Sequence, residues 1–349
     1  MRSSFEGQLG QDPGEVRQMS IQTAPDLAVD LAPQNPRELR LRNPVIAASG
    51  CFGYGEEYGS VIDVDRLGAF VSKGITPERR AGNPMPRIVE SPAGMLNAIG
   101  LQNPGIHGFV KKYPQMWARW NVPAIVNISA ESVNDYAMMA GILDEQPAIA
   151  ALEVNVSCPN IARGGYCFGW DPTMSAEVTR AVRSVTTLPI IVKLSPGASD
   201  IASVAIAVEE AGADAISLIN TLVGMAIDVR GRKPLLANHT GGVSGPAIKP
   251  IAVRMVYQVA AAVHVPVIGM GGIMGLNDAL EFFLAGATAI QVGTGIFVDP
   301  GLPIRLIDDL GRWLEDEGFS SLDQIVGIAN DGFRSGQARA TAAWESLGI

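Results

Sequence analysis

The strongest constraint on the fold of this chain is a set of eight short apolar runs rich in Val, Ile and Ala. Each run is followed by Gly, Ser, Asn or Pro and then by a helical pattern; in order, the runs cover residues 44–49, 69–73, 124–128, 152–156, 189–194, 215–220, 266–270 and 289–293. Continuous apolar runs of this kind are typical of parallel strands that are buried on both faces. Eight of them alternating with helices predict an α/β fold, namely a (β/α)8 TIM barrel.

The connections between these runs support a barrel. Residues 210–216 echo residues 284–290, and in both segments we expect a helix to end at a glycine, Gly212 or Gly286, before the next strand begins. Helical spacing of apolar residues is seen at Val178, Ala181, Val182 and Val185, and at Ile201, Val204, Ala205 and Val208.

The length of 349 residues fits one large barrel with insertions. Two connections, 76–108 and 221–249, are longer than a barrel needs, and we expect both to extend its carboxyl face. Residues 1–24 are polar and carry no apolar signal region, so they are interpreted as a disordered leader. Residues 25–349 are then expected to form the single catalytic barrel domain.

Composition excludes several classes of function. The net charge of −9 and the pI of about 4.9 argue against nucleic acid as a partner. Three cysteines without a paired framework indicate a reducing, cytoplasmic compartment, and they are too few to hold an iron–sulfur cluster. Residues 255–277 lack charged side chains, yet His264, Pro266 and clustered glycines indicate the end of a helix, a buried strand and a loop rather than a membrane span.

Polar side chains stand near the carboxyl ends of the predicted strands, where barrel enzymes build their active sites. These residues are Ser49, Lys73, Asn127, Asn155, Lys193 and Asn220. Any one Ser or Asn could simply cap the following helix. The two lysines at the edge of a barrel interior instead predict an anionic or electron-rich ligand, because an unpaired buried cation is costly.

Glycine-rich turns follow the last two strands, at residues 269–273 and 293–295. Backbone N–H groups in such turns can approach a phosphate, and these two turns occupy the usual phosphate position of the barrel. Beside a phosphate-bearing ligand, Lys193 suits the N1/O2 edge of a flavin, where it would stabilise the reduced, anionic ring. The alternative for Lys193 is a pairing with a buried carboxylate.

Longer segments resemble a known family. They are residues 72–76, 92–103, 155–160, 219–222 and 241–250, which read SKGIT, PAGMLNAIGLQN, NVSCPN, INTL and GGVSGPAIKP. With the two glycine turns, the chain resembles the class 1 dihydroorotate dehydrogenases from about residue 26 to 299, and within them the class 1B, NAD-linked catalytic subunits.

This resemblance implies FMN on this chain and a set of residues for it. The implied FMN residues are Ser49, Lys73, Gly74, Asn127, Asn155, Lys193, Ile219, Gly245, Gly271, Gly272, Gly293 and Thr294. The implied substrate residues are Lys73, Asn97, Ala98, Ile99, Gly100, Leu101, Asn155, Asn160, Asn220 and Thr221. Dihydroorotate is a carboxylate with ring amides, and amide side chains both donate and accept hydrogen bonds, so a ring of Asn with Lys73 suits it.

The implied reaction is the oxidation of (S)-dihydroorotate to orotate in pyrimidine biosynthesis, with hydride leaving C6 for FMN and a proton leaving C5. Cys158 is the only ionisable candidate for the base in its loop. A thiol of ordinary pKa, near 8.5, is a poor base at neutral pH, so its surroundings must lower that pKa or the loop must close over it. Inert packing is the alternative for Cys158, and it is the interpretation favoured for Cys51. Cys167, in a predicted mobile lid over 164–169, is expected to be incidental. The three histidines show no metal-binding spacing.

The class 1B resemblance implies that electrons pass to NAD through a partner that carries FAD and a [2Fe-2S] cluster, in a homodimer flanked by two such subunits. The sequence lacks a dinucleotide fingerprint, so NAD is not expected on this chain. Alternatives are a class 1A, fumarate-linked enzyme, an FMN barrel for another reduced pyrimidine, or a non-catalytic barrel for a phosphorylated metabolite. A dihydrouridine synthase is disfavoured, because a tRNA substrate calls for a basic surface.

Overall fold

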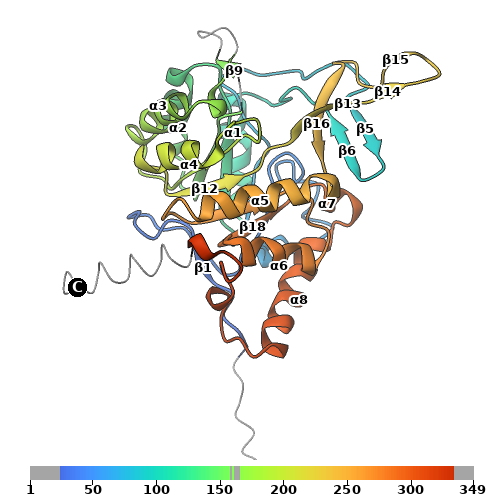
Figure 1. The fold of residues 1–349 in the computed structure, drawn as a ribbon. Helices are drawn as coiled ribbons and strands as arrows, with labels where there is room; N and C mark the ends of the chain where they lie inside the picture. Colours follow the sequence, from blue (N-terminus) through green and yellow to red (C-terminus); the bar gives the residue numbers. More distant parts are fainter. Residues whose placement is uncertain (1–23, 158, 161–165, 334–349) are drawn as a thin grey trace, which may run out of the picture.

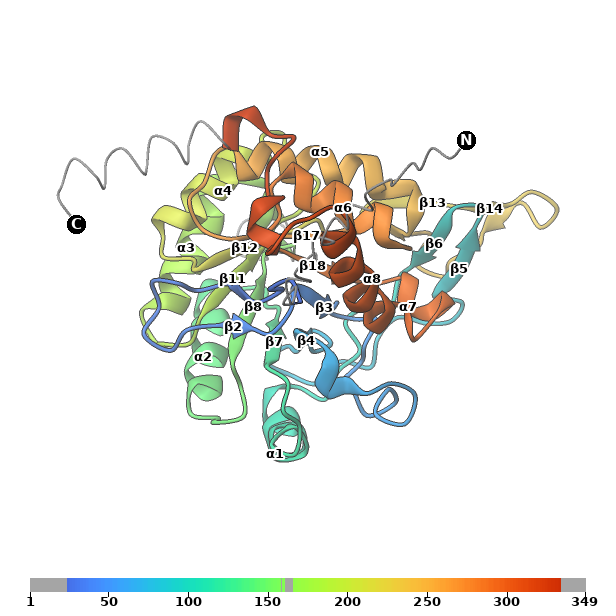
Figure 2. The same ribbon diagram turned by 90° about the horizontal axis from the view of Figure 1, so that it is seen from below.

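Eight parallel strands close into a barrel in the computed structural model, which describes residues 24–157, 159–160 and 166–333 (Figures 1 and 2). In barrel order the strands are β3 (Val45–Ala47), β4 (Ala69–Val71), β7 (Ala124–Ile128), β8 (Ala151–Asn155), β11 (Ile190–Lys193), β12 (Ala215–Leu218), β17 (Val267–Met270) and β18 (Ala289–Val292). Each lies within or one residue from a predicted apolar run, so the predicted TIM barrel is confirmed.

Helices cover the outside of this barrel. They are α1 (Ile106–Trp117), α2 (Val133–Asp144), α3 (Pro172–Arg183), α4 (Ile201–Glu210), α5 (Lys249–Ala260), α6 (Leu276–Ala285), α7 (Gly295–Val298) and α8 (Leu302–Asp316), with short 3-10 turns at Val64–Arg66, Phe168–Trp170, Pro246–Ile248 and Leu322–Gln324. The side chains of Ser132, Asp171 and Asp200 accept hydrogen bonds from first-turn N–H groups and so fix where α2, α3 and α4 begin.

The two segments with similar sequences, 210–216 and 284–290, both contain a glycine with positive φ at the end of a helix. Gly212 follows the cap of α4 with φ +100°, and Gly286 caps α6 with φ +114°. A Cβ at Gly286 would lie 2.6 Å from the Cβ of Ala260, so a side chain is excluded there by space as well as by backbone conformation. Both helices therefore end at the predicted glycines.

The predicted buried faces of the helices are right for α4 and partly wrong for α3. On α4, the side chains of Ile201, Val204, Ala205 and Val208 are all buried. On α3, Val178 and Val182 are buried, but Val185 lies beyond the end of the helix and is 43% exposed. The apolar spacing continued past residue 183, whereas the chain had already turned toward the next strand.

The charge-free stretch 255–277 is divided as expected among the end of α5, the strand β17 and a glycine turn. Across the described residues, no helix is both long enough and apolar enough to cross a membrane.

A short hairpin of β1 (Val29–Asp30) and β2 (Arg40–Leu41) covers the amino ends of the barrel strands (Figure 2). The side chains of Leu31 and Leu41 are fully buried in the core. Between the two strands, Asn35 Nδ2 donates to both carboxylate oxygens of Asp214 at 3.1 Å, immediately before β12. The amino end is thereby closed, which leaves the carboxyl end for a site.

The two long connections join each other in a separate sheet beside the barrel mouth (Figure 1). The first supplies β5 (Ile88–Ser91) and β6 (Gly94–Asn97), and the second supplies β13 (Leu222–Met225) and β16 (Thr240–Ser244), in the order β13-β16-β6-β5. A smaller hairpin, β14 (Ile227–Asp228) with β15 (Lys233–Pro234), projects from it. We call the four strands and this hairpin the sheet extension.

Candidate active site

A cavity of about 520 Å³ lies at the carboxyl ends of the barrel strands, and the sheet extension forms part of its wall. All twelve residues predicted for the cofactor line it: Ser49, Lys73, Gly74, Asn127, Asn155, Lys193, Ile219, Gly245, Gly271, Gly272, Gly293 and Thr294. Of the residues predicted for the substrate, it is also lined by Asn97, Ala98, Ile99, Gly100, Leu101, Asn220 and Thr221. The fold thus brings together residues that span almost 250 positions of sequence.

The charges on this wall are all of one sign. Lys73, Arg87 and Lys193 are the cations among the described lining residues, and none of those lining residues is Asp or Glu. Because cations around a partly dry cavity favour negative charge inside it, the wall suits anionic ligands.

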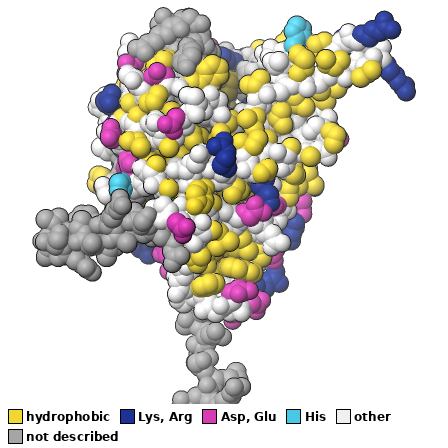
Figure 3. All heavy atoms as spheres, viewed as in Figure 1, with side chains coloured by type: hydrophobic (Ala, Val, Ile, Leu, Met, Phe, Trp, Pro, Cys, Tyr) yellow, Lys and Arg dark blue, Asp and Glu magenta, His cyan; other side chains and the backbone are white. Residues whose placement is uncertain are grey.

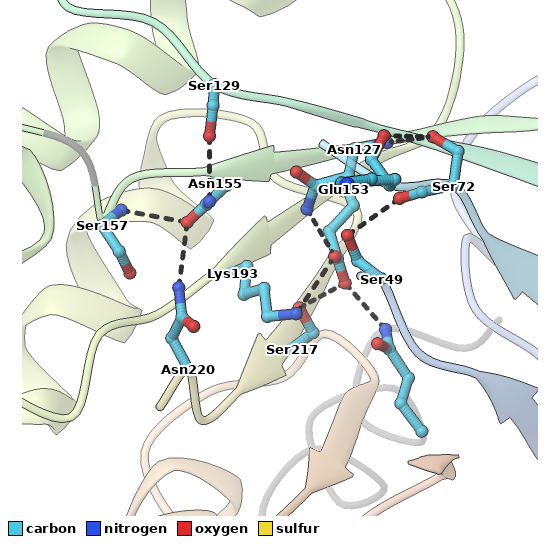
Figure 4. A network of polar contacts seen from close by, with 12 residues as sticks. Ser49, Ser72, Asn127, Ser129, Glu153, Asn155, Ser157, Lys193, Ser217 and Asn220 are labelled. Atoms are coloured by element: carbon cyan, nitrogen blue, oxygen red, sulfur yellow. Dashed lines mark hydrogen bonds and ion pairs between the residues drawn. The ribbon is translucent and has the colours of Figure 1, made fainter. Parts of the chain in front are cut away.

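One carboxylate lies just behind this wall. Glu153 stands in the middle of β8, two residues before Asn155 and therefore on the same face of the strand, and it is fully buried. Asn127 Nδ2 donates to its Oε1 at 2.8 Å, while Ser217 Oγ and Gln291 Nε2 donate to its Oε2 at 3.0 and 2.7 Å. These donors come from β7, β12 and β18, so one side chain ties four barrel strands together (Figure 4).

Lys193, the last residue of β11, completes this cluster. Its Nζ lies 3.4 Å from Glu153 Oε1, and its side chain is 8% exposed against 0% for Glu153. Lys193 also lines the cavity. The pairing of this lysine with a buried carboxylate is therefore confirmed. The same side chain also lines the cavity, and its contact with a flavin stays a prediction.

Cys51 lines the cavity near Lys193. Burial raises the pKa of its thiol to about 11, although the Lys193 cation acts in the opposite direction. At neutral pH the side chain is a neutral thiol, which agrees with packing and not with a role as a nucleophile or base.

Asn155 is held at the end of β8 by contacts on both sides of its amide (Figure 4). Its Nδ2 donates to Ser129 Oγ at 2.9 Å, and its Oδ1 accepts from the backbone N–H of Ser157 at 3.2 Å and from Asn220 Nδ2 at 3.3 Å. The hydroxyl of Tyr136 donates to the Asn155 carbonyl at 2.6 Å. These contacts fix which way the amide group faces before any ligand arrives.

Lys73 follows β4, and its backbone N–H donates to the carbonyl of Gly53 at 2.7 Å. Its side chain is half-buried in the cavity wall. Partial burial, together with the nearby Arg87 cation, lowers the pKa of the Lys73 ammonium, although Glu57 raises it. An anionic ligand at this position would relieve both unfavourable influences.

The segment from Asn97 to Leu101 forms another part of the cavity wall. Its backbone turns sharply, with φ +75° at Gly100 and +50° at Leu101. Buried Asn103 holds this turn, because its Nδ2 donates to the carbonyl of Leu101 at 2.6 Å and to Thr76 Oγ1 at 2.8 Å. A non-glycine residue with positive φ, held by a buried side chain, is typical of a ligand-binding turn.

The glycine turns after β17 and β18 leave backbone exposed at the cavity. Gly271 and Gly272 have φ of +129° and +77°, and Gly245, before α5, has +95°. A Cβ at Gly272 would lie 2.8 Å from Lys249 Cβ and 2.9 Å from the carbonyl oxygen of Gly245. Across this turn, Thr294 Oγ1 donates to Ser244 Oγ at 2.8 Å.

Cys158 itself lies outside the described residues, as do residues 164 and 165 of the predicted lid and the side chain of Asn160. Two short described strands follow β8 in sequence, β9 (Pro159–Asn160) and β10 (Tyr166–Cys167). They pair with each other in antiparallel fashion. Cys167 is buried, and its Sγ donates to the Val156 carbonyl at 3.4 Å. Among the residues described, no group of three or more His, Cys, Asp or Glu could hold a metal ion.

Sequence reasoning missed several residues of this site. Glu153 and Gln291 could have been found from the sequence, because each is a polar residue inside an apolar strand run. Asn103 and Arg87 gave no such signal, because loop sequence does not show which side chains turn inward.

Comparison with known proteins agrees with this geometry. A family model described as dihydroorotate dehydrogenase matches residues 32–314. A protein of Pelobacter propionicus, named dihydroorotate dehydrogenase B (NAD(+)), catalytic subunit, is 54% identical over 303 residues, which is 87% of this chain and 98% of that relative. Proteins of the same name from Trichlorobacter lovleyi and Desulforamulus reducens are 55% and 53% identical, covering 83% and 84% of this chain and 95% and 96% of the relatives.

Proposed function

The chain belongs to the dihydroorotate dehydrogenase family, and from this premise we propose how its cavity divides the oxidation of dihydroorotate to orotate among its residues. The observation that carries the proposal is the cavity wall, with three cations, no carboxylate among its described residues, and three asparagine amides at the carboxyl ends of β6, β8 and β12. Such a wall suits two anionic partners, a phosphate-bearing cofactor and a carboxylate substrate.

The residues present fit FMN. Gly272 leaves open a position that a Cβ would fill, and the buried Oε1 of Gln291, in the cavity wall, has no hydrogen-bond partner in the described structure. Gly245, Gly271, Gly272, Gly293 and Thr294 would hold the phosphate end, and Lys193 the ring. When bound, FMN supplies the acceptor for the hydride that leaves C6 of dihydroorotate.

The substrate would lie between Lys73 and the Asn97–Leu101 turn. Lys73 binds the carboxylate as an ion pair, which is stronger here than in water because the ammonium is half-buried. Asn97, Asn155 and Asn220 offer amide groups to the ring amides, and the contacts of Asn155 with Ser129 and Asn220 keep its donor and acceptor in fixed places. The orientation of the substrate is thereby set before reaction.

Proton removal from C5 is assigned to Cys158, in the loop that follows β8. The support for this assignment is the position of Cys158 in the sequence. It comes three residues after Asn155, and the described backbone of Ser157 is held by the Asn155 side chain. Asn160, two residues later, is proposed to contact the substrate from the same loop. The other two cysteines do not compete, because Cys51 has a raised pKa and Cys167 is buried away from the cavity wall.

The electron acceptor is proposed to be NAD, reached through a second subunit that carries FAD and a [2Fe-2S] cluster. The names of the similar proteins, NAD(+)-linked catalytic subunits, support this assignment over fumarate. Support for association with further chains comes from exposed apolar side chains on the sheet extension: Val223 (81%), Met225 (50%), Ile227 (58%) and Val229 (83%). Figure 3 shows hydrophobic side chains gathered over this part of the surface. We propose a cytoplasmic homodimer that forms a heterotetramer with two partner subunits.

Anaerobic mixing of the FMN-loaded chain with dihydroorotate tests the central assignment. Bleaching of the flavin absorbance, with orotate as product, is expected. Bleaching with dihydrouracil but not with dihydroorotate would instead identify an enzyme for another reduced pyrimidine, and failure of the purified chain to take up FMN would indicate a barrel that only binds a phosphorylated metabolite.

A further inference from the structure

Glu153 and Lys193 are an unusual pair within the described residues. Glu153 is the only carboxylate among them with a buried side chain, and Lys193 is the only buried cation. Burying two charges is unfavourable unless they are paired and hydrogen-bonded. A pair of this kind directly behind a ligand cavity therefore calls for an explanation beyond stability.

The hydrogen bonding of Glu153 is complete. Each carboxylate oxygen accepts two contacts, Oε1 from Asn127 and Lys193 and Oε2 from Ser217 and Gln291. Three of those donors, Asn127, Lys193 and Gln291, also line the cavity, whereas Glu153 does not. Glu153 thus touches no ligand space itself but holds three residues that do.

Among the described residues, Lys193 is the only cation that forms an ion pair with Glu153. The other lysine of the wall is Lys73, which is half-buried and lies in the field of Glu57 and Arg87. Lys193 has Glu153 at 3.4 Å as its only described ion-pair partner. Its Nζ is therefore held at a fixed depth in the barrel, and its positive charge is partly offset.

We propose that Glu153 is a positioning residue that sets, through Lys193, how strongly the site favours reduced over oxidised FMN. This inference rests on the proposed function, because it requires FMN above Lys193. A reduced flavin carries more negative charge than an oxidised one, so a fully uncompensated Lys193 would favour it more. Glu153 moderates that preference while keeping the ammonium in place.

The variant Glu153→Gln isolates the charge. It keeps the shape of the side chain, but places an amide where one carboxylate oxygen accepted two hydrogen bonds. The unpartnered Oε1 of Gln291 can accept from this new amide after the Gln291 side chain rotates, and the Ser217 hydroxyl can turn to accept as well. The buried cluster can therefore remain satisfied, and we expect the variant to fold and bind FMN.

The measurement is the midpoint potential of bound FMN, together with separate affinities for oxidised and reduced FMN. Glu153→Gln is expected to raise the ratio of reduced to oxidised affinity about tenfold, which is about 30 mV for a two-electron couple. Glu153→Asp keeps the charge but draws it back by one methylene, so it should keep the potential closer to that of the wild type. Glu56→Gln, which removes a carboxylate from an exposed pair with Lys112, is the matched control and should leave the potential unchanged.

A double variant separates action through Lys193 from direct action on the ring. Lys193→Met should lower the potential, and adding Glu153→Gln to it should then change nothing further. An unchanged potential in Glu153→Gln, or an equal upward shift in the Lys193→Met background, would overturn the inference. Failure of the wild-type chain itself to bind FMN would count against the proposed function instead, so the two failures are distinguishable.

Discussion

The amide Nδ2 of Asn97 donates to the carbonyl of Gly242 at 3.4 Å, joining two residues that lie 145 positions apart, one in each long connection. This contact belongs to the pairing of β6 with β16, in which Asn97 lies opposite Gly242 and Met95 lies opposite Ser244. The proposed substrate turn is therefore attached to a strand that leads to Gly245, at the proposed cofactor end of the cavity.

Gly242→Ala tests this connection. A Cβ at Gly242 would lie 2.1 Å from Thr221 Oγ1, so Thr221 must move out of the substrate wall. We expect the KM for dihydroorotate to rise about tenfold, since small displacements of positioning groups have effects of this size or larger. FMN content should not change. Gly141→Ala, on α2 with no atom within 4 Å of the new Cβ, is the control and should leave the KM alone. A normal KM in both variants would contradict the proposed role of Thr221.

Cys158→Ser should slow the reduction of bound FMN by dihydroorotate at neutral pH on the order of 100-fold, because a hydroxyl is a far weaker base than a thiolate. The flavin spectrum before mixing should be unaltered. Stopped-flow absorbance gives the rate. Cys167→Ser, which alters a buried thiol of β10, is expected to keep the wild-type rate. Unchanged reduction in Cys158→Ser would remove this cysteine from the mechanism.

Lys73→Ala should weaken orotate binding about 10- to 100-fold, the usual cost of losing a hydrogen bond to a charged group. Because the pKa of Lys73 is lowered, the ammonium loses its proton at a lower pH than an ordinary lysine, whose pKa is about 10.4. The affinity for orotate should therefore fall as pH rises and should begin to fall below that value. Lys73→Arg keeps its charge at alkaline pH, so any binding it retains should lack this decline. An orotate affinity that stays flat up to pH 10 in the wild type would contradict the assignment.

The purified chain alone should oxidise dihydroorotate with an artificial acceptor but should not reduce NAD at the full rate. The reason is that the sequence carries no dinucleotide fingerprint, and the similar proteins are named as subunits. Adding the iron–sulfur flavoprotein subunit should bring the NAD rate up to the dye-linked rate. Full NAD reduction without it would exclude the two-subunit scheme, and efficient turnover with fumarate would favour a class 1A enzyme.

Much of the barrel was predictable because its strands are short, continuous and apolar. The eight runs are visible in the sequence. Because barrel sites lie at the carboxyl ends of the strands, Ser49, Asn155 and Lys193 could be predicted to lie in one site. The buried face of α3 could not be placed as well, since Val185 continued an apolar spacing after the helix had ended. The pairing of β6 with β16 was also out of reach, because register between distant strands depends on contacts that no local pattern encodes.

Glu153 shows a different limit of prediction from sequence. A charged residue in an apolar run is visible in the sequence, but its meaning depends on four donors contributed by four other strands. Only the closed barrel brings Asn127, Ser217 and Gln291 to the same carboxylate.

The β6–β16 pairing also has a thermodynamic consequence. Ser244, in β16, contacts Thr294 beside the proposed phosphate position, and two positions along the same pair of strands Asn97 lies opposite Gly242. A ligand that orders one end of this sheet therefore reduces the entropy cost of ordering the other. By reciprocity, FMN should strengthen orotate binding by the same factor by which orotate strengthens FMN binding.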